Sequence, residues 1–467
     1  MTPPFLGWYG DDFTGATDTL SALARRGIRA LLFLGVPTPA QLSRAGTLEA
    51  VGIAGAARAM PPEAMRAALE PVGRFFAGLG VRVLHYKCCS TFDSAPEVGS
   101  LAVAMDTLRP AFPNRFLPVV GGQPGLGRYC LFGNLFAAAS TGGEVYRLDR
   151  HPTMSRHPVT PMHEADLRRH LAAQGMGRVA SLSFPAYALP AGELDARLAA
   201  LLREAPEAVL LDVSREEDLV PIGRLLRARA LAAPLLALGP SSVAEALAEA
   251  WPGEHQSVAA QRVPAQPEMA QLGAAHPGVA QSRAAQSGAA QSGAAQAAAA
   301  PSAPARSPVF VMVGSLSPVT RAQLEASPSY EHFRIGAAAL AGDDAAMRAL
   351  LEAVVSRLRN GRHVMVATER PAATDRLGPL DVARATARFL RLLMAEAPVR
   401  RLGIAGGDTS SLGAQALEFW GLSYLDMLAP GVVLCRGHSD DPRLDGVELM
   451  LKGGQMGPPD LFERFAA

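Results

Sequence analysis

The sequence is short of several features that would assign it to a common protein class. Its 467 residues include only 4 cysteines, and their positions form neither a zinc-ligand spacing nor a disulfide framework. No apolar run reaches the roughly 18 residues that a membrane span requires. The count of Lys+Arg is 44 against 43 for Asp+Glu, so there is no basic excess of the kind that nucleic-acid or membrane-surface proteins carry. The N-terminus also lacks a basic leader. We therefore expect a cytoplasmic protein that binds neither nucleic acid nor membrane.

Lysine is the scarcest charged residue. It occurs only at Lys87 and Lys452, and arginine supplies all the other Lys+Arg positions. A GC-rich coding bias explains such a preference, because a solvated surface accepts either cation. A lysine that persists under this bias indicates a place that needs a compact ammonium rather than a planar guanidinium. We expect Lys87 and Lys452 to face each other across a cleft; chance is the alternative for either one.

One stretch divides the chain. Residues 253–307 consist mainly of Ala, Gln, Ser, Gly and Pro. Glutamine recurs at every fifth position from Gln256 to Gln296, with His276 in the one gap, and this period builds neither a helical face nor one side of a strand. The composition predicts a flexible linker between a domain at residues 1–252 and a domain at residues 308–467. A partner-binding tail is the alternative.

On both sides of this linker, short apolar runs alternate with amphipathic stretches. The pattern predicts two α/β lobes with mainly parallel sheets. The expected strands are residues 5–9, 30–34, 50–54, 81–86, 179–184, 209–213, 235–238, 309–313, 364–367 and 402–405. The expected helices are residues 17–26, 62–77, 193–203, 216–229, 343–359 and 380–395.

The first candidate site is the run GDDFTGATD at residues 10–18, where the first strand gives way to a helix. Ligands of α/β sheets gather at the carboxyl ends of strands, and the N–H groups of the following helix attract anions. Asp11 and Asp12 can bind a metal or the hydroxyls of a polyol, and one of them can accept a proton. The alternative is that Asp12 or Thr14 only caps the helix.

The second candidate site is residues 86–94, YKCCSTFDS, directly after another predicted strand. Lys87 offers a point charge for a carboxylate or phosphate, and Ser90 offers a hydroxyl. An ordinary strand-to-helix loop with a capping residue is the alternative. The adjacent cysteines are more simply explained as packing residues, because no histidine is tied to them. A loop rich in proline and histidine at residues 148–162 is expected to pass near the site.

Three glycine- and hydroxyl-containing turns follow predicted strands after the linker: GSLS at residues 314–317, GGDTS at residues 406–410 and KGGQMG at residues 452–457. Glycine lets backbone N–H groups approach phosphates. Each turn alone is a weak signal, but together they predict a nucleotide site. None of them matches the Walker or GxGxxG pattern.

Taken together, DDFTGATD, GSLSPVT, GGDTS and KGGQMG resemble the four-carbon acid sugar kinase family over nearly the whole chain. The resemblance implies a lobe that binds a sugar acid, a lobe that binds ATP, and transfer of a phosphoryl group to a terminal hydroxyl of threonate, erythronate or 3-oxo-tetronate. In one respect the chain departs from the family, because many members carry an arginine in the loop after the lysine and residues 88–94 contain none.

The resemblance also implies roles for individual residues. Asp11, Asp12 and Arg58 match positions that bind the sugar acid, and Lys87 and Ser90 join them here. We expect Lys87 and Arg58 to hold the carboxylate of the acid. The expected nucleotide-binding residues are Ser315, Ser317, Gly406, Gly407, Asp408, Thr409, Lys452, Gly453 and Gly454.

These observations predict an ATP- and Mg²⁺-dependent kinase of a small sugar acid, in which Asp12 orients or deprotonates the C4 hydroxyl. The metal ligands are not identified, and a homodimer is possible. Two other classes stay open: a metal-dependent phosphohydrolase using Asp11 or Asp12, and a sensor that binds the sugar acid and the nucleotide without turnover.

Deleting most of residues 253–307 should leave folding and nucleotide affinity nearly unchanged. The segment lacks the apolar residues needed to offset the entropy of ordering it, and loop length adds only about 0.6 kcal/mol per doubling to the closure cost. Thermal unfolding and equilibrium binding of the shortened protein test this expectation. A shortened chain that precipitates, or that has no cooperative transition, would contradict the linker interpretation.

Overall fold

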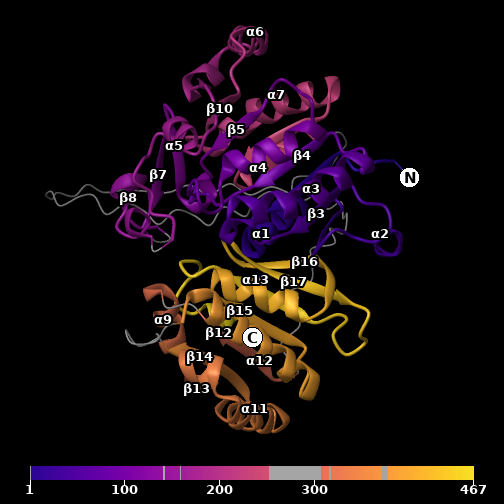
Figure 1. The fold of residues 1–467 in the computed structure, drawn as a ribbon, viewed down its shortest axis with the longest axis vertical. Coiled ribbons are helices and arrows are strands. Elements are labelled where there is room, and N and C mark those ends of the chain that lie inside the picture. The colour runs from indigo at the N-terminus through magenta and orange to yellow at the C-terminus, as the bar shows by residue number, and fades with distance from the viewer. Residues whose placement is uncertain (1, 140–141, 158, 252–306, 315–316, 370–376) are drawn as a thin grey trace, which may run out of the picture.

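A computed structural model describes residues 2–139, 142–157, 159–251, 307–314, 317–369 and 377–467. Two lobes are stacked on each other, with residues up to 251 in one and residues from 307 in the other (Figure 1). Both lobes consist of helices around a largely parallel sheet, so the predicted fold class is confirmed. The predicted linker lies outside the described residues except for Ser307, and the domain boundaries stay a prediction.

The N-terminal lobe contains a parallel sheet and a small antiparallel one. Its strands and helices are β1 (Leu6–Gly10), α1 (Phe13–Ala24), β2 (Ala30–Phe33), α2 (Pro39–Ala45), β3 (Ala50–Ala54), α3 (Pro62–Leu79), β4 (Val83–Lys87), α4 (Leu101–Leu108), β5 (Pro118–Gly121), β6 (Arg128–Leu131), β7 (Asn134–Ala138), β8 (Val145–Arg147), α5 (Leu167–Ala173), β9 (Val179–Leu182), α6 (Ala191–Arg203), β10 (Ala208–Asp212), α7 (Leu219–Ala232), β11 (Leu235–Gly239) and α8 (Ser242–Glu249).

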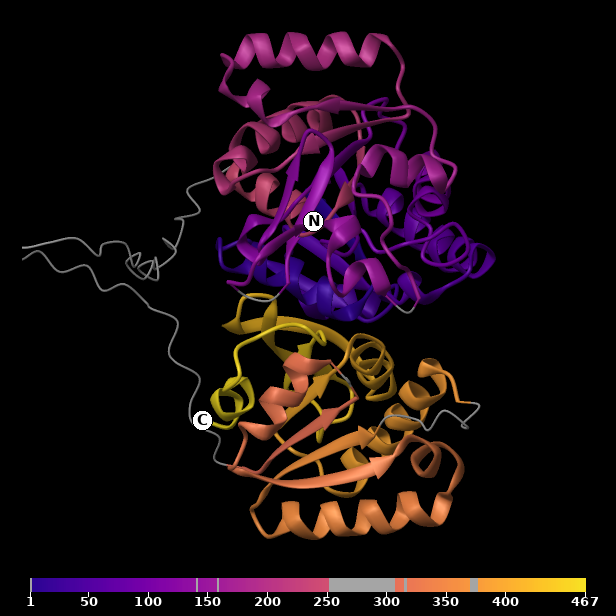
Figure 2. The same cartoon turned by 90° about the vertical axis from the view of Figure 1, so that its left-hand side faces the viewer.

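The C-terminal lobe repeats the alternation and adds a long antiparallel pair. Its elements are β12 (Val309–Val313), α9 (Pro318–Glu325), β13 (Tyr330–Gly336), α10 (Ala337–Gly342), α11 (Asp344–Arg359), β14 (His363–Glu369), α12 (Pro379–Glu396), β15 (Arg401–Ala405), α13 (Gly407–Ala416), β16 (Phe419–Ala429), β17 (Val432–Ser439), β18 (Glu448–Lys452) and α14 (Leu461–Ala466). Helices α6 and α11 lie at the two outer ends of the molecule in both views (Figure 2).

The two lobes share one continuous sheet of 15 strands, in the order β13-β14-β12-β15-β18-β17-β16-β2-β3-β1-β4-β11-β5-β10-β9. The junction is a short antiparallel pairing of β16 with β2, in which Gly421 lies opposite Phe33 and Leu422 opposite Leu32. Trp420 packs beside Phe33, with ring centroids 6.0 Å apart. The lobes are therefore joined by hydrogen-bonded strands as well as by the chain.

Local chemistry explains most element ends. Strands β1, β3, β4, β12 and β15 are buried along their whole length, as expected for parallel strands covered on both faces. Helix α1 starts at Phe13, four residues earlier than predicted, because Asp12 caps it. Helix α3 ends at Leu79 and is capped by Gly80, whose φ of 75° is left-handed. Among the described helices, none is long and apolar enough to cross a bilayer.

The sequence analysis missed several strands. Strands β5 to β8 and the β16–β17 pair are short, half-exposed or irregular, so their apolar runs are weak. The helix predicted at residues 216–229 begins only at Leu219, and a 3₁₀ turn precedes it at Glu216–Asp218. The sequence also gave no sign that β2 and β16 would pair, because that contact joins residues almost 400 positions apart.

Candidate active site

The candidate residues of the N-terminal lobe follow three neighbouring strands. Strand β1 lies between β3 and β4, and Gly10 is in register with Ala54 and Lys87. The backbone of Asp11 then bridges the other two segments, because its N–H donates to the Lys87 carbonyl at 3.0 Å and its carbonyl accepts from the Arg58 N–H at 3.1 Å. The parallel sheet thus brings together residues that are far apart in the sequence.

Arg58 binds both carboxylates with its side chain. Its Nη2 and Nε atoms lie 2.7 and 3.2 Å from the two oxygens of Asp11. Its Nη1 atom donates to Oδ2 of Asp12 at 3.1 Å, and Nη2 lies 3.0 Å from Oδ1 of the same residue. The three side chains form one largely buried ion cluster.

Asp12 also caps helix α1. Its Oδ1 atom accepts from the Gly15 N–H at 2.9 Å, and Oδ2 accepts from the Thr14 hydroxyl at 2.6 Å. The capping alternative raised by the sequence is therefore correct for Asp12. It does not account for Asp11, which makes no cap and is tied to Arg58 instead.

The two neighbouring carboxyls titrate differently. Burial raises the pKa of Asp11 above its usual value, and the opposing effect of Arg58 is not sufficient to reverse this. Burial also acts to raise the pKa of Asp12, but the charges of Arg58 and Lys87 and the bonds from Thr14 and Gly15 outweigh it, so this pKa is lowered. Asp12 is the more firmly ionised of the two.

Lys87 reaches the same cluster from the end of β4. Its side chain is 4% exposed, and its pKa is raised because Asp12 and Asp11 outweigh the effect of burial. A Cβ atom at Gly15 would lie 2.3 Å from Nζ, so the glycine makes room for the ammonium. Within the described residues Nζ donates no hydrogen bond, and its donors are open to a ligand.

The rest of the loop after β4 is also buried beside the cluster. Ser90 is 9% exposed. Asp93 accepts from the Thr91 hydroxyl at 2.7 Å, and Arg58, Cys89, Thr91 and His157 together outweigh burial and lower its pKa to about 2. His157 brings the predicted proline- and histidine-rich loop into this neighbourhood. Burial raises the pKa of Cys89 to about 11, so this thiol is no nucleophile at neutral pH.

The candidate turns of the C-terminal lobe meet in the same way. Strands β12, β15 and β18 are neighbours, and the turns follow their carboxyl ends. A Cβ at Gly314 would lie 2.1 Å from the Thr409 hydroxyl. The N–H of Gly406, whose φ is 127°, donates to the Lys452 carbonyl at 2.8 Å. Helix α13 then starts at Gly407 and points its N-terminus out of this edge.

Ser317 and Thr320 connect the first turn to the last. The Ser317 hydroxyl caps α9 and also donates to the Gly454 carbonyl. The Thr320 hydroxyl donates to that carbonyl at 2.8 Å. Ser315 lies outside the described residues, and so does the side chain of Asp408. Thr320, which the sequence analysis did not select, stands three positions after Ser317 in the pattern of a capped helix.

Lys452 lies beneath the last turn. It is completely buried, and its Nζ donates to the Thr320 hydroxyl at 2.8 Å, the Gly453 carbonyl at 2.9 Å and the Gly454 carbonyl at 3.3 Å. Burial lowers its pKa to about 7. The expectation that Lys452 faces Lys87 across the cleft was wrong, because the ammonium is directed at its own turn.

The N-terminus of α13 lies opposite the carboxylates of the other lobe. A cavity of about 60 Å³ between the lobes is lined by Asp11, Asp12, Ala56, Arg58, Ala59, Gly407, Ser411 and Leu412. The N–H of Phe13 lies 3.5 Å from the Ser411 hydroxyl across the boundary. The cavity is small, so side chains of the two lobes approach each other closely at this place. Ser411 was not predicted, although it follows Gly407 by one helical turn.

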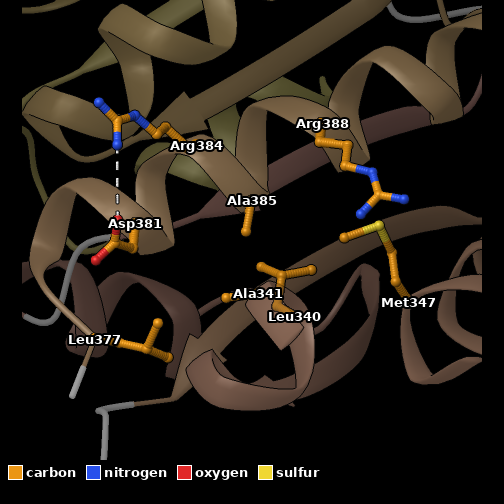
Figure 3. A pocket seen from close by; sticks show the side chains of 8 residues that line it. All are labelled: Leu340, Ala341, Met347, Leu377, Asp381, Arg384, Ala385 and Arg388. Atoms are coloured by element: carbon orange, nitrogen blue, oxygen red, sulfur yellow. Dashed lines mark ion pairs between the residues drawn. The ribbon is translucent and has the colours of Figure 1, made fainter. Parts of the chain in front are cut away.

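A larger hollow lies elsewhere on the C-terminal lobe, among α10, α11 and α12 (Figure 3). Its volume is about 360 Å³, and it is lined by Leu340, Ala341, Met347, Leu377, Asp381, Arg384, Ala385 and Arg388. Arg384 lies 3.7 Å from Asp381, and Arg388 lies 2.8 Å from Asp344. Both cations are therefore paired, and none of the predicted site residues lines this hollow.

The described side chains contain no group of three or more His, Cys, Asp or Glu residues placed to hold a metal ion. The donors nearest to the cavity are Asp11 and Asp12. Mg²⁺ typically keeps several waters and binds one or two carboxylates together with substrate phosphates. This donor set fits such an ion only when a phosphate supplies further ligands.

Comparisons with known proteins agree with the division into two lobes. Residues 6–247 match the family model described as a sugar-binding N-terminal domain, and residues 310–462 match that of a nucleotide-binding C-terminal domain. The chain is 37% identical to a 3-oxo-isoapionate kinase of Paraburkholderia graminis, over 98% of this chain and 93% of the relative. It is 28% identical to a 3-oxo-tetronate kinase of Cupriavidus necator, over 98% and 96%.

Solved structures share the fold. A Salmonella typhimurium protein described as a putative tRNA synthase superposes with a TM-score of 0.73 at 24% identity, over 98% of both chains. A Haemophilus influenzae protein superposes with a TM-score of 0.67 at 22% identity, also over 98% of both chains. At this level of identity the likeness concerns the fold alone.

The unfolding free energy should rise with pH between about 7 and the ordinary lysine value of 10.5. Across this window Lys452 is largely neutral in the folded protein and protonated in the unfolded chain, so the unfolded state binds more protons and loses stability as pH rises. The slope is up to about 1.4 kcal/mol per pH unit. Chemical unfolding from pH 7 to 10 should show a smaller slope in Lys452→Met than in the wild type.

The control is Lys87→Met, at the other lysine. The pKa of Lys87 is raised, so its loss should leave the slope below pH 10 unchanged. Equal slopes in the wild type and Lys452→Met would show that Lys452 keeps its proton in the folded protein.

Proposed function

The chain belongs to the four-carbon acid sugar kinase family, and from this premise we propose that it transfers the terminal phosphoryl group of ATP to the C4 hydroxyl of a small sugar acid. The candidate acceptors are 3-oxo-tetronate, threonate and erythronate. The 37% identity to a 3-oxo-isoapionate kinase adds 3-oxo-isoapionate to the candidates. In this proposal residues 1–252 bind the acid and residues 308–467 bind the nucleotide.

The observation that carries the proposal is the cavity between the lobes. One wall is the N-terminus of α13, and the other contains Asp11 and Asp12. A helix N-terminus presents free N–H groups and positive potential, which favour a phosphate. A phosphoryl group held there would point at the carboxylates, where an acceptor hydroxyl must stand for in-line attack.

The glycine turns supply the rest of the nucleotide site in this proposal. Gly314, Gly406 and Gly453 carry no side chain at the edge where the phosphates would lie, so the phosphates could come close to the backbone there. The N–H groups of Gly314 and Gly406 are bonded to the Ala405 and Lys452 carbonyls, so the donors to the phosphates would be the N–H groups at the start of α13. Ser315, Ser317, Asp408 and Thr409 would add polar contacts. Lys452 would act from below by holding the carbonyls of Gly453 and Gly454, which turns those peptide units toward the ligand.

Asp12 would orient the acceptor hydroxyl and accept its proton. Its low pKa keeps it ionised, which suits a group that mainly positions the hydroxyl while phosphoryl transfer proceeds. Asp11 holds Arg58 in place and, with its raised pKa, is the second candidate for the base. Lys87 and Ser90 would contact the acid.

Mg²⁺ would be bound mainly by the phosphate oxygens of ATP, with Asp11 or Asp12 as the protein carboxylate. When bound, it would neutralise charge on the transferring group. The residues of this chain position the two substrates and exclude water from between the lobes.

An ADP-release assay with the purified protein, ATP and Mg²⁺ tests the proposal. Stereoisomers of threonate and erythronate, 3-oxo-tetronate and 3-oxo-isoapionate would each be supplied as acceptor. We expect ADP formation that depends on one of these acids. Phosphate release from phosphoesters without ATP would instead support the phosphohydrolase alternative, and binding of both ligands without ADP would support the sensor.

Asp12→Asn should lower kcat about 100-fold or more while ATP binding stays intact, as for the loss of a general base worth 10²- to 10⁴-fold. Asparagine caps helices about as well as aspartate, so the change removes the charge and keeps the cap. Steady-state kinetics and the ATP dissociation constant measure the two effects.

The matched control is Asp343→Asn. Asp343 caps α11 through the N–H groups of Ala345 and Ala346, away from the boundary between the lobes. This variant should keep the wild-type kcat. If Asp12→Asn also turns over at the wild-type rate, Asp12 is a helix cap and no more.

A further inference from the structure

The positive charges nearest to the proposed acceptor are already matched by negative ones. Among the described residues, the Arg58 side chain donates its hydrogen bonds to Asp11 and Asp12. The remaining cation, Lys87, is stabilised by the same two carboxylates. These two cations therefore already face the carboxylates of Asp11 and Asp12, with Asp93 as a third within reach of the Arg58 charge, and a sugar acid adds one more carboxylate to this buried space. Burying that charge requires a further cation.

Arg128 stands at the edge of this space. It is the first residue of β6, in the small antiparallel sheet formed by β6, β7 and β8. The Cys130 N–H donates to the Val213 carbonyl at 2.8 Å, which seats β6 on the carboxyl end of β10. The backbone of Arg128 exchanges hydrogen bonds with Gln123, just after β5. Arg128 thus belongs to a small sheet that covers the same edge of the large sheet where Asp11 and Lys87 lie.

The guanidinium of Arg128 has no anionic partner in the part of the chain that the structure describes. Its Nη1 atom donates to the Leu126 carbonyl, and its buried Nε atom has no hydrogen-bond acceptor. Burial lowers the pKa of Arg128, and the groups that act against this are Cys89 and Tyr129, neither of them a carboxylate. An arginine in this state has unused donors for a planar anion.

Its neighbours place Arg128 beside the acid site. Gln123, whose backbone exchanges hydrogen bonds with that of Arg128, donates from its side chain to Asp18 on helix α1 at 2.9 Å. Arg128 also pairs with Ala137 of β7, next to the Ala138 carbonyl that lies 3.4 Å from Nε2 of His151. Cys89, in the loop that follows Lys87, is near enough to influence the pKa of Arg128. Cys89 is also close enough to Arg58 and Lys87 for both charges to act on it. Leu126, whose carbonyl Arg128 binds, lies next to Gly431 at the β16–β17 turn of the other lobe. Arg128 is therefore near the boundary between the lobes, on the side of the β4 loop.

We propose that Arg128 binds the carboxylate of the sugar acid and so makes the enzyme select acids over uncharged polyols. The assignment rests on the proposed kinase function. The carboxylate at Arg128 would leave the far end of the acceptor at Asp12, and Lys87 would lie between them. The planar guanidinium suits a carboxylate because it can form two parallel hydrogen bonds with it.

The test is steady-state kinetics of Arg128→Gln and Arg128→Lys, with the best acceptor from the ADP-release assay and with ATP varied in turn. Losing a hydrogen bond to a charged group should raise the KM of Arg128→Gln for the acid about 10- to 100-fold. The KM for ATP should stay within about twofold of the wild-type value. Arg128→Lys keeps the charge and should recover part of the loss.

A second readout uses an acceptor without the carboxylate. The ratio of kcat/KM for the acid to that for the matching tetritol should fall in Arg128→Gln, because only the acid loses a contact. An unchanged ratio would overturn the proposal even if both values declined.

Arg227 provides a matched control. It lies on α7 (Leu219–Ala232), its Nη1 atom donates to the Ala250 carbonyl at 2.7 Å, and its buried Nε atom also has no acceptor. Arg227→Gln should leave both KM values unchanged, because an unsatisfied buried Nε away from the site binds no substrate.

The outcomes distinguish a failure of the kinase proposal from a failure of the proposed role of Arg128. A wild-type protein that forms no ADP with any acid would refute the kinase proposal. Wild-type turnover with an unchanged acid KM in Arg128→Gln would refute the role of Arg128 alone. A rise confined to the KM for ATP would mean that Arg128 binds phosphate. Equal rises in both KM values with a lower Tm would mean that Arg128 only supports the structure around β6. Either result overturns the proposal.

Discussion

The bidentate binding of Asp11 by Arg58 is the interaction on which the rest of the site depends. Two adjacent carboxylates at the end of a buried strand would repel each other and lose hydration. The Arg58 guanidinium, held by the 3₁₀ turn after β3, lies against both. Lys87 approaches from β4 on the other side of β1. The site exists only because three adjacent parallel strands end at the same edge of the sheet. It therefore forms when the sheet forms.

The same constraint operates in the other lobe with a different result. Strands β12, β15 and β18 also bring three turns to one edge, but those turns carry glycine and hydroxyl groups instead of paired charges. The β2–β16 pairing then makes both edges part of one continuous sheet. Because hydrogen bonds fix that register, Asp12 and the start of α13 come to line one cavity. The sheet edge of the N-terminal lobe carries paired charges, whereas that of the C-terminal lobe presents uncharged N–H groups. The two edges therefore suit two different anions.

The sequence was sufficient for the parts of this arrangement that follow from local pattern. Buried parallel strands read as unbroken apolar runs, so β1, β3, β4, β12 and β15 were predictable, and so were the motifs at their ends. The directions in which the side chains point were not predictable from the sequence. The full burial of Lys452 follows from packing against α9, and the approach of Arg128 depends on β6, a four-residue strand with a weak pattern. Contacts between distant segments, including β2 with β16, have no local signal.

The scarcity of lysine has a structural explanation at both places where it remains. Nζ of Lys452 meets three acceptors, the Thr320 hydroxyl and the carbonyls of Gly453 and Gly454. A lysine amino group is compact and rotates to meet such a set, with three donors when it is protonated and two when it is neutral, whereas a guanidinium presents five donors in one plane. Nζ of Lys87 fills the space left by the missing side chain of Gly15, which is too small for the wider group. Coding bias can replace lysine with arginine only where the surroundings accept the larger, planar cation, and neither of these two buried positions does.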